Sequence, residues 1–143
     1  MASKVFADTN IIIDFLEQRP FDLEFVNKLF YLAESGELDI YVSESVITNA
    51  LYISKLNDQT SRLLNILNII CIGKNTIKAA LESTFSDKED AILYHGSFEN
   101  GMHCFLTRNR KHFEKNKINE LPVYTVREFF ETFYNKDQPI SLS

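Results

Sequence analysis

Residues 4–16 read KVFADTNIIIDFL, and this stretch decides how the fold begins. The apolar run Lys4–Ala7 has the length of a short β-strand and stops at Asp8. Directly behind it, apolar residues recur at helical spacing, namely Ile11, Ile12, Phe15 and Leu16. A change from a short apolar run to this periodicity predicts a strand followed at once by a helix.

Outward from this unit, short apolar runs continue to alternate with helical segments. Four more strands are predicted, at Leu38–Val42, Ile69–Ile72, His103–Leu106 and Val123–Tyr124. The signals for the helices are a buried stripe (Phe21, Phe25, Leu29, Leu32) ended by Gly36, a cap at Ser43, periodicity near Ser61–Asn68 and Lys74–Ser83, and capping boxes at Ser86–Glu89 and Thr125–Glu128. Strands separated by helices pair in parallel through right-handed crossovers. The sequence therefore predicts an α/β fold, a three-layer α/β/α sandwich whose central, mainly parallel sheet has about five strands.

Composition narrows the class of protein. The chain has 143 residues, of which 45% are hydrophobic and 24% charged, as in an ordinary globular protein. We expect a single domain over residues 1–135 and a polar tail over 136–143. Cys71 and Cys104 lie in apolar runs and are expected to be buried free thiols, as is usual in a reducing cytoplasm. No apolar run reaches the ~18 residues of a membrane span, so we expect a cytoplasmic protein without a membrane partner.

Oxygen-bearing side chains lie at the ends of the predicted strands or at the start of a helix nearby. They are Asp8, Glu44, Asp87, Asp90, Thr107 and Asn109. Because ligands of open parallel sheets bind at the carboxyl ends of the strands, we expect these side chains to share one rim. Two carboxylates repel each other by about 4 kcal/mol at roughly 4 Å and an effective dielectric constant of about 20. Such a cluster needs a cation, and oxygen ligands favour Mg²⁺ or Mn²⁺.

The neighbouring charges indicate what this cation would act on. Net charge is −5, which argues against broad attraction to nucleic acid. Locally, however, basic residues begin directly after the fourth predicted strand: Arg108, Arg110, Lys111, Lys115 and Lys117, opposed only by Glu114. A basic flank beside a metal site would hold a phosphate backbone, and Mg²⁺ suits phosphodiester hydrolysis. The glycine-rich loops of nucleotide-cofactor sites are missing from the sequence.

These motifs resemble the PIN-domain family along nearly the whole chain, from about residue 4 to 130. The resemblance rests on VFADTN at 5–10 with Asp14 six residues after Asp8, VSE at 42–44, FSDKEDA at 85–91 and LTRN at 106–109, with His112–Phe113 behind. We expect Asp14 outside the metal cluster or beside its ligands. It implies an α/β sandwich and a Mg²⁺- or Mn²⁺-dependent endoribonuclease. Many bacterial members are VapC-like toxins, so the resemblance also implies RNA as substrate, an antitoxin protein as partner and a homodimer.

The resemblance assigns roles residue by residue. Metal ligands would be Asp8, Glu44 and Asp90, with Asp87 at a neighbouring acidic position, and the catalytic set would be Asp8, Glu44, Asp90 and Asn109. Substrate contacts and orienting groups would be Thr9, Asn10, Thr107, Arg108, Arg110 and Lys111. The chain departs from the family at Asn109 and His112, where many members carry Asp. A neutral Asn109 implies weaker metal binding, or one ion instead of two.

Other interpretations stay open on the sequence alone. Asp8 and Asp87 are also good helix caps, and Glu44 suits the first turn of a helix. Asn109 and the acidic net charge favour a second function, a catalytically weakened PIN-fold module that binds RNA or protein. A third class, a phosphatase of the haloacid-dehalogenase type, needs Asp two residues after Asp8, where this chain has Asn10.

Overall fold

The computed structural model describes residues 2–115 and 121–134, and in this part of the chain five strands form one sheet. The strands are β1 Ser3–Ala7, β2 Leu38–Ser43, β3 Asn68–Ile70, β4 Cys104–Leu106 and β5 Val123–Tyr124. Their order is β3-β2-β1-β4-β5, and every neighbouring pair is parallel. The predicted α/β class and parallel sheet are confirmed, whereas the predicted tail, 136–143, lies outside the described residues.

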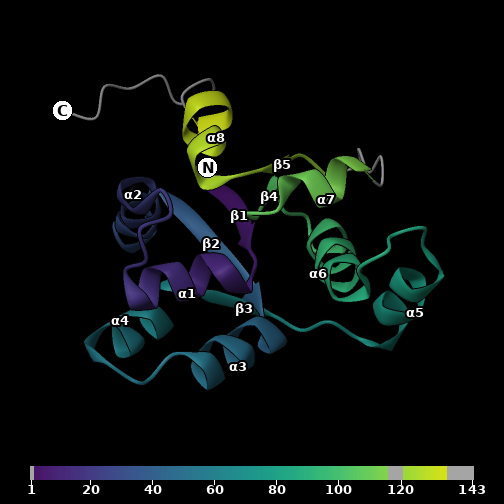
Figure 1. The fold of residues 1–143 in the computed structure, drawn as a ribbon, viewed down its shortest axis with the longest axis horizontal. Coiled ribbons are helices and arrows are strands. Elements are labelled where there is room, and N and C mark those ends of the chain that lie inside the picture. The colour runs from purple at the N-terminus through teal and green to yellow at the C-terminus, as the bar shows by residue number, and fades with distance from the viewer. Residues whose placement is uncertain (1, 116–120, 135–143) are drawn as a thin grey trace.

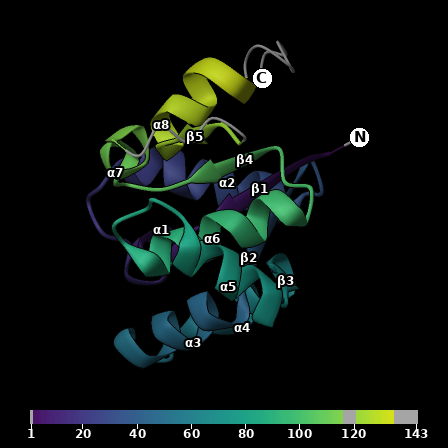
Figure 2. The same ribbon diagram turned by 90° about the vertical axis from the view of Figure 1, so that its right-hand side faces the viewer.

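Helices cover both faces of this sheet (Figures 1 and 2). They are α1 Thr9–Glu17, α2 Leu23–Glu34, α3 Glu44–Ile53, α4 Asp58–Ile66, α5 Lys74–Glu82, α6 Lys88–Glu99, α7 Arg110–Lys115 and α8 Val126–Glu128, which runs on into a π-helical turn, Phe129–Tyr134. The chain first steps from β1 through β2 to β3, and then returns across the sheet to β4 and β5. Since the crossovers are right-handed, this reversal places α1 and α2 on the opposite face from α5 and α6.

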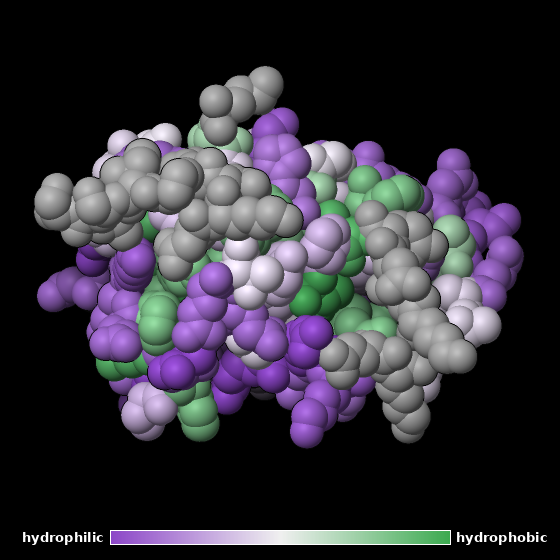
Figure 3. Space-filling view, turned by 90° about the horizontal axis from the view of Figure 1, so that it is seen from above, coloured by the Kyte–Doolittle hydropathy of each residue, from purple (hydrophilic) through white to green (hydrophobic). Residues whose placement is uncertain are grey.

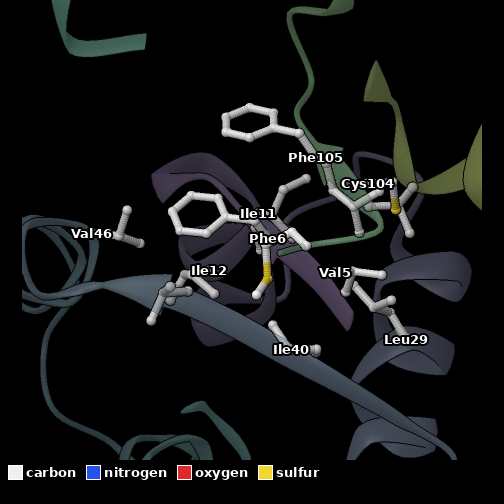
Figure 4. Packing of buried hydrophobic residues seen from close by; sticks show 14 of the residues in the cluster. Val5, Phe6, Ile11, Ile12, Leu29, Ile40, Val46, Cys104 and Phe105 are labelled. Carbon is white, nitrogen blue, oxygen red and sulfur yellow. The ribbon is translucent and has the colours of Figure 1, made fainter. Parts of the chain in front are cut away.

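The core fixes β1 between β2 and β4 (Figure 4). Val5 pairs in register with Ile40 on one side and with Cys104 on the other. The rings of Phe6 and Phe105 stack at 5.3 Å between centroids. These side chains are buried on both faces of the sheet, which is why β1 reads as a continuous apolar run. As a result, the carboxyl ends of β1 and β4 lie next to each other.

A second aromatic group, Phe85, Tyr94, Phe105 and Phe113, holds α6 and α7 against this edge. The Phe113 ring lies 5.1 Å from the Phe85 ring and 5.0 Å from the Phe105 ring. The Tyr94 hydroxyl donates to the Leu121 carbonyl at 3.0 Å. Because Phe113 follows His112 directly and Tyr94 lies one helical turn after Asp90, this packing also positions two candidate site residues.

Several predicted helix ends are confirmed. Gly36 adopts φ +84° just past α2, and the Glu37 amide donates to the Leu32 carbonyl at 2.9 Å. This left-handed conformation is the one that favours glycine behind a helix. The Ser43 hydroxyl accepts from the Val46 amide, and Thr125 forms the predicted capping box.

Three local predictions are wrong. The helix behind Phe85 is capped by Asp87, whose carboxylate accepts from the Asp90 amide at 3.1 Å, because α6 begins one residue later than a cap at Ser86 requires. Phe21 is 47% exposed, since α2 begins only at Leu23 and Phe21 precedes its buried face. Cys71 is exposed because β3 ends at Ile70, whereas Cys104 is buried as expected.

The surface combines polar and apolar side chains. On the face seen from the top of Figure 1, hydrophobic residues gather near the middle between hydrophilic ones (Figure 3). Among the described residues, no helix is long and apolar enough to cross a membrane.

Candidate functional site

The end of β1 and the end of β4 form the point where the chain reverses direction across the sheet. Behind β1 the chain enters α1 on one face, and behind β4 it passes toward α7 on the other (Figure 2). The Asp8 amide donates to the Leu106 carbonyl at 3.1 Å, and the Thr107 amide donates to Tyr124 at 3.0 Å. Ligands of open parallel sheets bind at such a reversal, in the crevice beyond the carboxyl ends.

Asp8 follows β1 directly, at this reversal of the chain. Its side chain caps α1 by accepting from the Ile11 amide at 3.3 Å, and it also accepts from the Thr107 hydroxyl. Only 6% of the residue is exposed. Burial is the main cause that raises the pKa of Asp8 to about 6. The Asp90 charge contributes to this rise, whereas the two hydrogen bonds and the charge of Arg108 oppose it. Asp8 is therefore a helix cap whose ionised carboxylate is unfavourable in its buried position.

Asp90 approaches Asp8 from the first turn of α6. Burial raises its pKa, the Asp87 charge adds to this effect, and His112 opposes it. The Asp90 Oδ2 atom lies 3.7 Å from Nδ1 of His112 on α7. Asp87, Asp90 and His112 each offer a ligand atom, and these atoms lie within 4.8 Å of one another. The start of α6 and the helix α7 thus bring two carboxylates and one imidazole together.

Glu44 has other neighbours. It is the first residue of α3, is exposed, and accepts a hydrogen bond from the Cys71 thiol, which raises the pKa of that thiol. With Asn49 and Glu89 it lines a separate cavity of about 520 Å³. Among the described residues, no contact joins Glu44 to Asp8 or Asp90. Its assignment as a metal ligand stays a prediction.

The residues around β4 differ in how closely they approach Asp8. Thr107 is buried and bonds Asp8 directly, whereas Asn109 is exposed and donates its amide to the Thr107 hydroxyl at 3.0 Å. Thr9 and Asn10 are half-buried in the first turn of α1. These positions make Thr107 an orienting group for Asp8 and leave the Asn109 side chain in solvent.

The predicted basic flank divides into separate contacts. Arg110 pairs with Glu128 of α8, with 3.4 Å between Nη1 and Oε2, and Lys111 is exposed on α7. Lys117 lies outside the described residues, as do the side chains of Glu114 and Lys115.

Arg108 points to a residue that the sequence reasoning did not place in the site. Its Nε atom lies 3.2 Å from Oδ2 of Asp14, and its guanidinium stacks over the Phe21 ring at 4.4 Å. Asp14 is fully buried, which raises its pKa, while Arg108 lowers it. The sequence did contain a signal for the burial of Asp14. Its spacing in α1 places it on the same helical face as the apolar residues Ile11 and Phe15.

Comparison with known proteins settles the family. The PIN domain profile matches residues 4–111. The chain belongs to the PIN-domain family. Ribonuclease VapC1 of Aquifex aeolicus (strain VF5) is 26% identical to this PIN domain over 141 residues, which cover 91% of this chain and 95% of that protein. The crystal structure of VapBC2 from Rickettsia felis, bound to a DNA fragment from their promoter, matches with a TM-score of 0.62 at 19% identity. That match covers 85% of this chain and 98% of the solved one, and it supports the PIN fold.

Proposed function

We propose that this PIN domain is a metal-dependent endoribonuclease that hydrolyses RNA phosphodiester bonds, and that it is the toxin of a toxin–antitoxin pair. The observation that carries the proposal is the group of ligand atoms offered by Asp87, Asp90 and His112, which lie within 4.8 Å of one another. The buried Asp8 behind β1 is near enough for the Asp90 charge to raise its pKa. The similarity to a protein named as a ribonuclease supports the reaction class.

A divalent cation fits the residues of this crevice. Asp8 is buried, its pKa is raised to about 6, and the charge of Asp90 adds to the cost of ionising it. A cation between the two carboxylates would remove that repulsion, and Asp87 and His112 offer further ligand atoms beside Asp90. Mg²⁺ or Mn²⁺ is the expected cofactor. When bound, such an ion polarises the phosphodiester and lowers the pKa of the attacking water.

The protein's own residues orient this chemistry. The Thr107 hydroxyl donates to Asp8 and fixes the direction of its carboxylate. The Asp87 side chain holds the first turn of α6 by accepting from the Asp90 amide, which sets the position of Asp90. Lys111 and Arg110 on α7 supply positive charge next to His112, where an RNA backbone would approach the acidic crevice.

An antitoxin and a second copy of the chain are the proposed protein partners, in the cytoplasm. The similarity to a VapC1 protein supports the antitoxin. Large apolar side chains are also exposed around the end of α3. Tyr52 is 91% exposed, Leu56 is 75% exposed, and Ile53, between them in the sequence, is exposed as well. An apolar surface of this kind is typical of a protein–protein interface.

A second function, a catalytically weakened module that binds RNA or protein, is favoured by two observations. The side chain of Asn109 lies in solvent, and Glu44 bonds the Cys71 thiol instead of a residue of the crevice. Both reduce the number of carboxylates available to a cation.

The deciding experiment measures cleavage and metal binding together. Purified protein, freed of any partner, is incubated with a panel of structured and unstructured RNAs in Mn²⁺ or Mg²⁺, and calorimetry follows Mn²⁺ binding. We expect saturable binding and cleavage by the wild type, and loss of both in Asp8→Asn. The exposed Asp58→Asn, on α4, is the matched control and should behave as wild type. Undiminished cleavage by Asp8→Asn contradicts the nuclease, and binding of RNA without any cleavage favours the module.

A further inference from the structure

A cavity of about 320 Å³ opens beside the crevice. It lies between the loop that joins α1 to α2, the start of α8, and Arg108 behind β4. Ile11, Val26 and Val126 make part of its wall apolar, while Asp14, Arg108 and Thr125 bring polar groups to it. A concave site with apolar walls and a few convergent polar groups is typical of a site for a small ligand.

The carboxylate of Asp14 in this wall lacks hydrogen-bond donors. The side chain is fully buried, and neither oxygen accepts a hydrogen bond from the described residues. Arg108 lies 3.2 Å away and balances the charge, but its Nε–H does not point at the carboxylate as a hydrogen bond requires. A buried carboxylate without donors is costly, so its presence calls for a ligand that supplies them.

The charges around the cavity favour a neutral ligand. Asp14 is paired with Arg108, and Asp22 at the rim is paired with Arg127 at 3.4 Å between Oδ1 and Nε. Each negative charge therefore has a positive partner, so the cavity has little excess charge with which to hold a phosphate. The ring of Phe21, over which the Arg108 guanidinium stacks at 4.4 Å, adds an aromatic surface that becomes free when Arg108 turns away. A planar, uncharged and polar group fits these features, and a nucleobase is such a group.

We propose that this cavity binds a guanine base of the RNA substrate, with Asp14 accepting from the guanine N1–H and N2–H groups and Arg108 donating to its O6 carbonyl. The inference rests on the proposed function, because it names the base that the nuclease would prefer. Guanine has two adjacent N–H donors next to a carbonyl, which match the two oxygens of Asp14 and the neighbouring guanidinium. Adenine and cytosine present a lone-pair nitrogen beside their amino group, which a carboxylate repels.

The cavity is placed to hold a base next to the cleaved bond. Asp14 follows Asp8 by six residues in the sequence, which is about 9 Å along a helix. Arg108 follows Thr107, whose hydroxyl bonds Asp8. Entry of the base requires the Arg108 side chain to turn away from the carboxylate that it covers. Its several single bonds permit this, and the guanidinium then faces the base.

Nucleotide binding tests the proposal without any cleavage. Calorimetry in EDTA, which keeps the acidic crevice free of metal, compares GMP with AMP, CMP, UMP and XMP, which has a carbonyl in place of the guanine amino group. We expect the wild type to bind GMP about tenfold more tightly than the others. In Asp14→Asn the new amide donates to that carbonyl, so the preference is expected to reverse toward XMP. A merely structural role of Asp14 would not produce this reversal.

Controls keep the outcomes separate. Phe21→Ala changes an exposed side chain, and we expect it to weaken GMP binding about tenfold even if Asp14→Asn fails to fold. Asp58→Asn should bind as the wild type does. Equal affinity for all nucleotides, no binding at millimolar concentration, or an unchanged preference in a folded Asp14→Asn overturns the guanine site. RNA cleavage with no base preference and no GMP binding overturns the guanine site alone, whereas Asp14-dependent GMP binding without cleavage of any RNA overturns only the nuclease.

Discussion

The Nδ1 atom of His112 lies 3.7 Å from Oδ2 of Asp90, although the two residues belong to different helices, α7 and α6. Phe113, next to His112, is packed into the aromatic group that also contains Tyr94 of α6, so this proximity is built into the core. Asp90 in turn raises the pKa of Asp8. The crevice thus has the buried carboxylate of Asp8, the half-buried carboxylate of Asp90 and one imidazole nitrogen, and imidazole favours Mn²⁺ over Mg²⁺.

Replacing His112 by Asp is expected to change the metal preference. A third carboxylate adds negative charge and a hard oxygen ligand, so affinity for Mg²⁺ should rise by about tenfold and the advantage of Mn²⁺ should shrink. Calorimetric titration of both ions measures this. Asn109→Asp is the companion variant, because it adds the same charge nearby without removing the nitrogen. Unchanged affinities for both ions in His112→Asp would show that His112 stays outside the coordination shell.

Replacing Asp8 by Asn should abolish RNA cleavage and yet stabilise the metal-free protein. At pH 7 the buried carboxylate of the wild type is ionised, because the pH lies above its raised pKa of about 6. Burying this charge destabilises the folded state. The rise in pKa from the ordinary 3.8 of an aspartate corresponds to about 3 kcal/mol of lost stability, which the neutral amide avoids. Urea denaturation of both proteins in EDTA measures the free energy of unfolding. A less stable Asp8→Asn would mean that its hydrogen bonds to Ile11 and Thr107 outweigh the burial of charge.

The same pKa shift predicts how stability depends on pH. Below pH 3.8 the Asp8 carboxyl group is protonated in the folded and the unfolded state. The folded state then has its full stability, because no charge is buried at Asp8. Between 3.8 and about 6 the folded state keeps a proton that the unfolded state releases, so the stability contributed by Asp8 falls as pH rises. Above about 6 that contribution is lost. The difference between wild type and Asp8→Asn, measured by urea denaturation from pH 4 to 7.5 in EDTA, should follow this curve, and a flat difference contradicts the raised pKa.

Much of the fold could be predicted because local and tertiary preferences agree. The strand residues Val5–Ala7 are apolar because both faces of the sheet are covered. Gly36 ends a helix through its left-handed backbone, and Ser43 caps one through its hydroxyl. The errors arose where several residues were equally suitable. Ser86 and Asp87 both cap helices well, and the choice depends on the packing of Phe85 into the core.

One packing feature was invisible in the sequence and can be tested by Gly96→Ala on α6. A Cβ atom on Gly96 would lie 2.6 Å from Cδ1 and 2.9 Å from Cγ1 of Ile72, so Ile72 must move out of its place. We expect a loss of about 1–3 kcal/mol in the free energy of unfolding. Gly73→Ala is the matched control, because open space surrounds that position. Adding Ile72→Ala to Gly96→Ala should remove the clash, and equal stability of both single glycine variants would contradict the close contact.

The site was predictable only in part, because sequence reasoning places residues at strand ends without their side-chain directions. The charge of Asp90 raises the pKa of Asp8, and Thr107 bonds Asp8, while the shared metal site that the sequence assigns to Asp8 and Asp90 stays a prediction. Glu44 also follows a strand, yet its side chain bonds Cys71 behind β3. Asp14 was expected outside the metal cluster or beside its ligands, but its partner could not be predicted, because Arg108 is distant in sequence and comes next to it only in the fold.

Measurements of metal affinity can tell whether Glu44 or Asp90 is a metal ligand. In the structure Asp90 is half-buried beside His112 and Asp87, whereas Glu44 is exposed and lines a different cavity with Glu89. We therefore expect Asp90→Asn to weaken Mn²⁺ binding by at least about tenfold, and Glu44→Gln to change it by less than about twofold. Each substitution removes one charge and keeps the size of the side chain, so each serves as the control for the other. Equal losses in both variants would mean that the bound ion draws Glu44 away from Cys71 into the crevice, as the family resemblance implies.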